Sequence, residues 1–250
     1  MKMLILFLVP LLAGLVIFIV PKARSTNFKL LLVFAGSYLF AITVIHILPE
    51  LYRQYGEVEL IGLFVLLGFF LQQFLEYFTS GVEHGHIHTH EHAGHAHSHT
   101  QSEISALVLL AALCVHAFLE GGMVAQGELV DYQYDMKAIL LGIAMHRAPA
   151  AFALMAVLSD QLRSKRRAIP YLLVFSLAAP LGLFISEYFI EIELLTQTGL
   201  IFLYAIVSGN FLHISTTIVF ESSPDHHFNA RKLAIAILGS LLAVVVEFVI

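Results

Sequence analysis

Eight stretches of predominantly apolar residues alternate along the chain with polar segments. They run roughly over residues 3–20, 28–49, 58–80, 104–126, 136–158, 168–190, 197–220 and 231–250. Each is close to the ~20 residues that an α-helix needs to cross about 30 Å of hydrocarbon. The pattern predicts an all-α fold in which residues 1–250 form a single membrane domain, a polytopic bundle of eight transmembrane helices.

The composition supports a membrane protein and excludes several other classes. Of the 250 residues, 59% are hydrophobic and 12% are charged, whereas a soluble domain has about 25% charged residues. The one cysteine, Cys114, lies inside an apolar stretch, which excludes a disulfide framework and a thiolate metal cluster. The sequence has no basic patch that suits nucleic acid. Its apolar composition makes the lipid bilayer the expected surrounding.

The polar segments differ in charge on the two sides of the predicted bundle. Those after the first, fifth and seventh apolar stretches hold nine of the 13 lysines and arginines, whereas the segments on the opposite side are mainly acidic. Short loops rich in basic residues stay in the cytoplasm. We therefore expect both termini on the non-cytoplasmic side, and an acidic outer face that attracts cations.

The long polar segment after the third stretch, residues 81–103, has a composition that indicates metal contact. Histidines alternate there with small residues, and nothing in the segment can build a packed core. We expect a disordered cytoplasmic loop that binds metal weakly at several positions, with a merely solvated linker as the alternative. Histidine tracts bind zinc, copper, nickel and cobalt alike, so the loop does not identify the metal. Its eight histidines are His84, His86, His88, His90, His92, His95, His97 and His99.

Two of the apolar stretches carry ionisable residues near their centres. His116 and Glu120 are four residues apart, which puts them on one face of a helix, and His146 lies within the next stretch. An ionisable group at this depth costs about 2.5 to 3.5 kcal/mol on insertion scales, so it is kept where it has a function. Two imidazoles and a carboxylate predict a transition-metal site, although a hydrogen-bonded structural group is the simpler alternative.

Several short motifs, in this order around the His-rich loop, resemble those of the ZIP (Zrt/Irt-like) family of divalent metal transporters. Residues 46–50 read H-I-L-P-E, similar to the family's H-L-L-P-E, and residues 208–213 read S-G-N-F-L-H, near its A-G-T-F-L-Y. Residues 68–76 resemble the glycine-to-glutamate segment before the family's loop, and residues 179–182 are close to its A/E-P-x-G element. The resemblance implies an eight-helix transporter that assembles as a homodimer.

The metal motifs match the family only in part. The family's H-N-x-P-E-G stands here as His116 to Gly121 and keeps both His116 and Glu120. The family's H-E-x-P-H-E keeps His146 and Pro149, but three metal-binding positions have become Arg147, Ala150 and Ala151. The resemblance therefore implies one metal rather than two. The fixed charge of Arg147 either pairs with Glu120 or occupies the place of the second cation.

Five further polar residues within or near the spans are candidates for a metal pathway. Two of them, four residues apart, suit an outer mouth, and a glutamate near the outer end of the sixth span suits uptake. A glutamate near the inner end of the third span suits release, and a histidine inside the seventh span is a weaker candidate. For each, the alternative is an ordinary structural or solvent-facing role. They are His46, Glu50, Glu187, Glu76 and His213.

These features together predict a transporter that moves a divalent transition metal into the cytoplasm, and not an enzyme. Zinc is the first expectation for the cargo, with Fe2+, Mn2+, Co2+ and Cd2+ left open. No Walker motif is present in the sequence, so ATP is not expected to drive the movement.

Two other functions compete with transport. The replaced positions in the second metal motif favour a ZIP-like sensor or assembly partner that binds metal without moving it. Four histidines within spans could instead converge on a zinc-bound water, as in an intramembrane hydrolase. Those histidines are His46, His116, His146 and His213.

Overall fold

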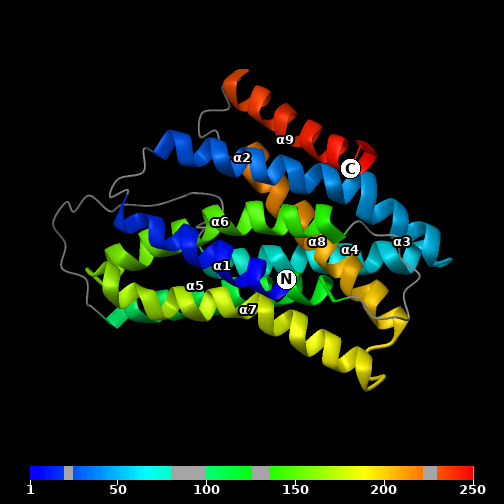
Figure 1. Ribbon diagram of the computed structural model, residues 1–250, viewed down its shortest axis with the longest axis horizontal. Helices are drawn as coiled ribbons and strands as arrows, with labels where there is room; N and C mark the ends of the chain where they lie inside the picture. The colour runs from blue at the N-terminus through cyan, green and yellow to red at the C-terminus, as the bar shows by residue number, and fades with distance from the viewer. Residues whose placement is uncertain (20–24, 80–99, 126–135, 222–229, 250) are drawn as a thin grey trace.

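The computed structural model describes residues 1–19, 25–79, 100–125, 136–221 and 230–249, and these residues are helical without any β-strand (Figure 1). The 3-10 turn Val16–Phe18 extends the first helix, and the π-helical segment Thr43–Ile47 joins the second helix to the third. The helices are α1 (Lys2–Leu15), α2 (Ser25–Ile42), α3 (Leu48–Gln54), α4 (Val58–Thr79), α5 (Thr100–Met123), α6 (Met136–Gln161), α7 (Lys165–Glu191), α8 (Gln197–Glu221) and α9 (Ala230–Val249).

Because α2, the π-helical segment and α3 run on without a break, the helices of the described residues form eight long segments that match the eight predicted spans. The predicted all-α membrane bundle is confirmed. Among the described residues, five segments are long and apolar enough to cross a membrane, and two shorter apolar helices accompany them. The five are Leu30–Gln54, Val58–Tyr77, Lys137–Gln161, Lys165–Glu191 and Gln197–Val219, and the shorter two are Lys2–Phe18 and Leu107–Met123.

Two predicted boundaries differ from the structure. The second span was expected to end at residue 49, but the helix continues to Gln54, because Pro49 directly follows the π-helical segment and such local adjustments let a membrane helix continue past a proline. The His-rich loop was expected to run to residue 103, but α5 begins at Thr100. The polar residues at the start of α5 resemble a loop in composition, which explains the second difference. The eight histidines of the loop, residues 84–99, lie outside the described residues.

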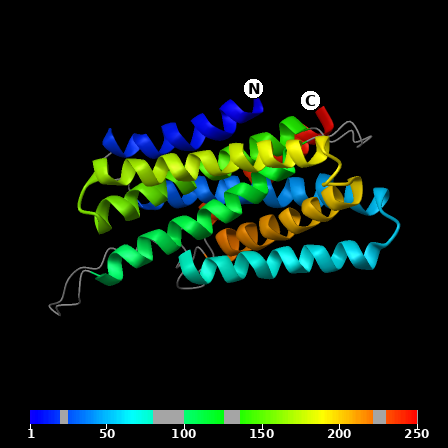
Figure 2. The same cartoon turned by 90° about the horizontal axis from the view of Figure 1, so that it is seen from below.

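The helices form two groups of four. Helices α1, α5, α6 and α7 pack mainly on one another, and α2, α4, α8 and α9 form the second group (Figures 1 and 2). Two tyrosine hydroxyls join the groups. Tyr38 of α2 donates to the carbonyl oxygen of Ala138 at 3.0 Å, and Tyr204 of α8 donates to that of Ala125, just after α5, at 3.1 Å.

Within each group, glycines allow two helices to cross with their backbones almost in contact. At the crossing of α5 and α7, a Cβ on Gly121 would lie 1.9 Å from the carbonyl oxygen of Ala179. At the crossing of α4 and α8, a Cβ on Gly68 would lie 1.9 Å from that of Ile206. Small residues at such contacts are the usual basis of close helix packing in membranes. The crossing at Gly121 fixes the part of α5 that carries the predicted metal ligands.

Candidate metal centre

Helix α5 supplies two of the three predicted ligands. His116 and Glu120 stand one turn apart, and the Nε2 atom of His116 lies 3.2 Å from the Oε1 atom of Glu120. Both side chains are buried, at 3% and 0% exposure. A carboxylate with no exposed surface needs a cationic or hydrogen-bonding partner, so further polar side chains are expected beside this pair.

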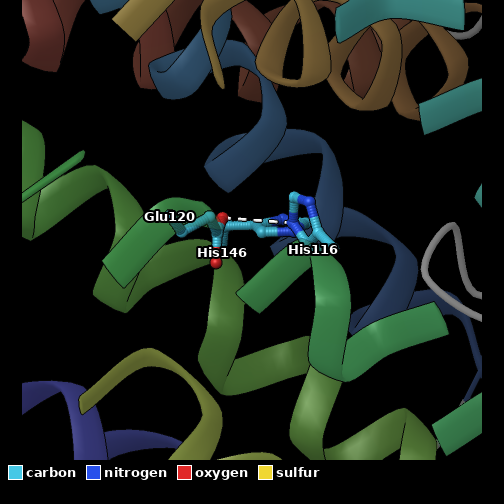
Figure 3. Close-up of side chains that lie close together, drawn as sticks. All are labelled: His116, Glu120 and His146. Atoms are coloured by element: carbon cyan, nitrogen blue, oxygen red, sulfur yellow. Dashed lines mark ion pairs between the residues drawn. The ribbon is translucent and has the colours of Figure 1, made fainter. Parts of the chain in front are cut away.

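Helix α6 supplies the third ligand. The His146 ring meets the His116 ring edge to face, with centroids 5.9 Å apart, and His146 is also buried. One potential ligand atom from each of His116, Glu120 and His146 can be chosen so that all three lie within 4.8 Å of one another. Figure 3 shows the three side chains gathered between the two helices. The structure therefore brings together the residues that the sequence selected.

The donor set suits a borderline divalent transition metal. Two neutral imidazoles and one carboxylate are an open zinc first shell, in which the fourth position is left for water or an exchanging ligand. Bonds of about 2.0 to 2.2 Å place neighbouring ligand atoms roughly 3.3 Å apart in a tetrahedron. The widest spacing allowed by the 4.8 Å limit would have to close by roughly 1.5 Å for the side chains to hold the ion.

Arg147 follows His146 and is buried beside the same carboxylate. Its Nη1 atom lies 3.9 Å from the Oε2 atom of Glu120, and its Nη2 atom donates to the carbonyl oxygen of Phe175 in α7 at 3.0 Å. The guanidinium carbon also lies 4.8 Å from the centre of the Phe175 ring. Of the two arrangements expected for Arg147, the structure has the ion pair with Glu120. One carboxylate oxygen thus faces an imidazole and the other faces a guanidinium.

The positions that differ from the family's second metal motif belong to the apolar core. Ala150 and Ala151 are buried in a cluster with Leu154 and Leu172 and offer no ligand atom. Helix α6 runs without interruption through Pro149, although this proline leaves the carbonyl of Met145 without its helical donor. Neither position contributes a ligand atom to the group of His116, Glu120 and His146.

Two of the pathway candidates contact each other. The Nε2 atom of His213 in α8 lies 2.5 Å from the Oε2 atom of Glu76 in α4. The His213 ring also contacts the Phe69 ring in an edge-to-face arrangement. The His213 ring is largely buried, while Glu76 keeps 19% of its side chain exposed. This pair lies beyond the crossing of α4 and α8 and is separate from the three-residue centre.

The other candidates lie apart from the centre. His46, in the π-helical segment, has its Nδ1 atom 2.7 Å from the Oε1 atom of Glu247 in α9. Glu50 contacts Arg53 and accepts a hydrogen bond from Gln54.

Glu187 is exposed near the end of α7. Sequence reasoning missed Glu247, whose signal was its position as the one charged residue in the stretch 233–250.

One comparison with known proteins bears on these residues. A family model described as "ZIP Zinc transporter" matches residues 81–247. The match covers more than half of the chain, and it includes the His-rich segment, both helices that carry the three buried ligands, and the α8 histidine of the second pair.

Proposed function

The chain belongs to the ZIP zinc transporter family, a family of divalent metal transporters rather than enzymes, and we propose that it carries zinc into the cytoplasm through a single-metal site. The proposed ligands are His116, Glu120 and His146. Zinc is cargo here, and Fe2+, Mn2+, Co2+ and Cd2+ are the other candidates for the same donor set.

The observation that carries this proposal is the gathering of three ligand side chains inside a membrane bundle. All three are buried, and one ligand atom from each lies within 4.8 Å of the other two. Burying a carboxylate and two imidazoles in hydrocarbon is costly. Direct coordination of a metal ion would offset this cost, whereas packing against apolar side chains would not.

Arg147 supports a site for one metal and tunes how strongly it is held. Its guanidinium balances the charge of Glu120 when no metal is bound. An arriving divalent ion must share Glu120 with this fixed cation. The proposed consequence is a site that binds weakly enough to release its ion, as a transport site requires.

The proposed direction follows the charges along the chain. Acidic outer segments raise the local cation concentration, and Glu187, His46 and Glu50 stand at the side proposed as the outer mouth. Glu76 lies in the last turn of α4, at the end that leads into the His-rich segment, and it pairs with His213 of α8, so the proposal places this pair on the inner part of the path. In this proposal both termini face the non-cytoplasmic side, and residues 81–99 receive the released ion.

Zinc flux into liposomes tests the proposal most directly. Protein whose eight histidines at residues 84–99 are replaced by serine would be purified and reconstituted around an internal zinc dye, with and without His116→Ala. The matched control is Val115→Ala, a lipid-exposed neighbour on the same helix. Flux that is lost in His116→Ala and retained in the control is expected. Equal flux in all three proteins would contradict transport through this site.

Metal sensing without transport is the second candidate, because Arg147 occupies part of the site and the neighbouring Ala150 and Ala151 lack ligand atoms. One zinc bound per chain, with no flux in native protein, would favour it. No observation favours the hydrolase. The structure pairs His46 with Glu247 and His213 with Glu76, so these two histidines do not converge on the centre.

A further inference from the structure

Two side chains of α8 bury polar atoms that make no hydrogen bond. The Oδ1 and Nδ2 atoms of Asn210 and the Nδ1 atom of His213 have no hydrogen-bond partner among the described residues. Asn210 is 0% exposed and His213 is 6% exposed. Burying an amide without a hydrogen bond is costly, and such a group calls for an explanation such as a bound water molecule or ion.

The contact with Glu76 decides which nitrogen of His213 can bind a metal ion. The Nε2 atom lies 2.5 Å from the Oε2 atom of Glu76, and an ionised carboxylate only accepts hydrogen bonds. In the neutral ring, Nε2 therefore carries the proton and Nδ1 carries the lone pair. Histidines that bind metals commonly donate their other N–H to a carboxylate in this way. Glu76 thus orients the ring and leaves Nδ1 as the ligand atom.

Asn210 lies where it can supply a second ligand atom. It precedes His213 by three residues, so the two side chains lie on one face of α8 about one turn apart. Large side chains in a helix lean back over the preceding turn, which brings the His213 ring toward Asn210. Phe69 of α4 contacts this ring edge to face, with centroids 4.8 Å apart, and restricts its movement. An amide oxygen and an imidazole nitrogen together suit a borderline divalent metal.

The two residues lie on the inner side of the metal centre. One end of α5 meets α8, where a Cβ on Gly122 would lie 3.4 Å from the Cδ2 atom of Leu203. From there the two helices run back alongside each other (Figure 2). His116 lies six residues before Gly122 and Asn210 seven residues after Leu203, about 9 and 10 Å along their helices. Asn210 is therefore at about the depth of His116, and His213 lies one turn further along α8.

We propose that His213 and Asn210 form a second, weaker binding position for a divalent transition metal. Its ligand atoms are Nδ1 of His213 and Oδ1 of Asn210, water molecules complete the coordination sphere, and Glu76 holds the ring without touching the ion. A position with so few protein ligands suits an ion on its way from the three-residue centre to the His-rich segment. That role in release rests on the proposed transport, whereas binding at this position can be measured without it.

Calorimetric zinc titration of the purified protein tests the position. The eight loop histidines, His226 and His227 would be replaced by serine. Two binding events are expected. The weaker event should be lost in His213→Gln and retained in His116→Ala, and the stronger event should show the reverse. Zinc binding that is unaffected by His213→Gln would overturn the proposal, whereas binding that is unaffected by His116→Ala would contradict the three-residue centre instead.

The variant Asn210→Leu distinguishes a ligand from a structural amide. Leucine is apolar and of similar size, so replacing an amide without hydrogen bonds should raise the thermal unfolding midpoint, while the weaker zinc event loses about tenfold or more in affinity. The matched control is Ser208→Ala, an equally buried position on the same helix whose hydroxyl donates to the carbonyl oxygen of Tyr204 at 2.7 Å. It should leave both zinc events unchanged. Native affinity in Asn210→Leu would overturn the assignment of this ligand.

Nitrogen NMR of the His213 ring identifies the ligand atom. Its resonances are assigned by their absence in His213→Gln. Zinc added beyond the first equivalent is expected to shift the Nδ1 resonance while Nε2 keeps its proton. In Glu76→Gln, the weaker zinc event should lose about 10- to 100-fold in affinity, because the partner that orients the ring is altered. Loss of the Nε2 proton on zinc binding, with Nδ1 unchanged, would overturn the proposed geometry.

Discussion

Arg147 donates a hydrogen bond to the backbone oxygen of Phe175 at 3.0 Å and rests its guanidinium over the ring of the same residue. The contact fastens α6 to α7 next to the metal centre. The guanidinium also interacts with Glu120, because its Nη1 atom lies 3.9 Å from the Oε2 atom of that carboxylate. The proposed metal and Arg147 therefore compete for one carboxylate.

Removing the charge of Arg147 should strengthen metal binding. In Arg147→Gln, made in protein whose loop histidines are replaced by serine, zinc affinity is expected to rise by at least about tenfold, because a like charge a few ångströms from the metal is removed. Isothermal titration calorimetry measures the change. Weaker binding would mean that Arg147 acts only as a structural pin between α6 and α7.

Removing the aromatic face of Phe175 should have the opposite effect. Phe175→Leu keeps the carbonyl acceptor but removes a cation–π contact of about 0.5 to 2 kcal/mol. Arg147 then interacts more with Glu120, so zinc affinity should fall about two- to thirtyfold. In the double variant with Arg147→Gln this loss should vanish. A loss that persists without Arg147 would point to repacking of the core instead.

The pair of Glu76 and His213 should affect movement of the metal more than its binding. Glu76→Gln and His213→Gln are each expected to slow zinc flux several-fold while leaving equilibrium binding at the centre unchanged. The double variant should resemble either single one, because residues in direct contact act as a unit. Stopped-flow dye measurements on liposomes give the rates. Flux at the native rate in both single variants would remove the pair from the pathway.

The local features of this fold could be read from the sequence, and the contacts between distant helices could not. His116 and Glu120 were predictable because a helix places residues four apart on one face. Two contacts join helices that are far apart in the chain, namely Glu247 with His46 and Glu76 with His213. They could not be predicted because hydrophobic periodicity carries no information about which helices meet. The acceptor of Arg147 is a backbone carbonyl of Phe175, which leaves no trace in a residue pattern.

The helix crossing beside the metal centre should be the least tolerant part of the bundle. In Gly121→Ala, the new Cβ would lie 1.9 Å from the Ala179 carbonyl oxygen, so α5 and α7 must separate. Overpacking of this kind costs about 1 to 3 kcal/mol. The thermal unfolding midpoint in detergent should fall, and zinc binding should weaken because α5 also carries two ligands.

Gly62→Ala in α4 is the matched control for that crossing. No heavy atom lies within 4 Å of the Cβ that it would add. Alanine is favoured over glycine inside a helix by about 1 kcal/mol, so this variant should be as stable as native protein or slightly more so. If both alanine variants unfolded at the same temperature as native protein, α5 and α7 would have to separate without any loss of stability. The close crossing would then contribute nothing to holding His116 and Glu120 in place.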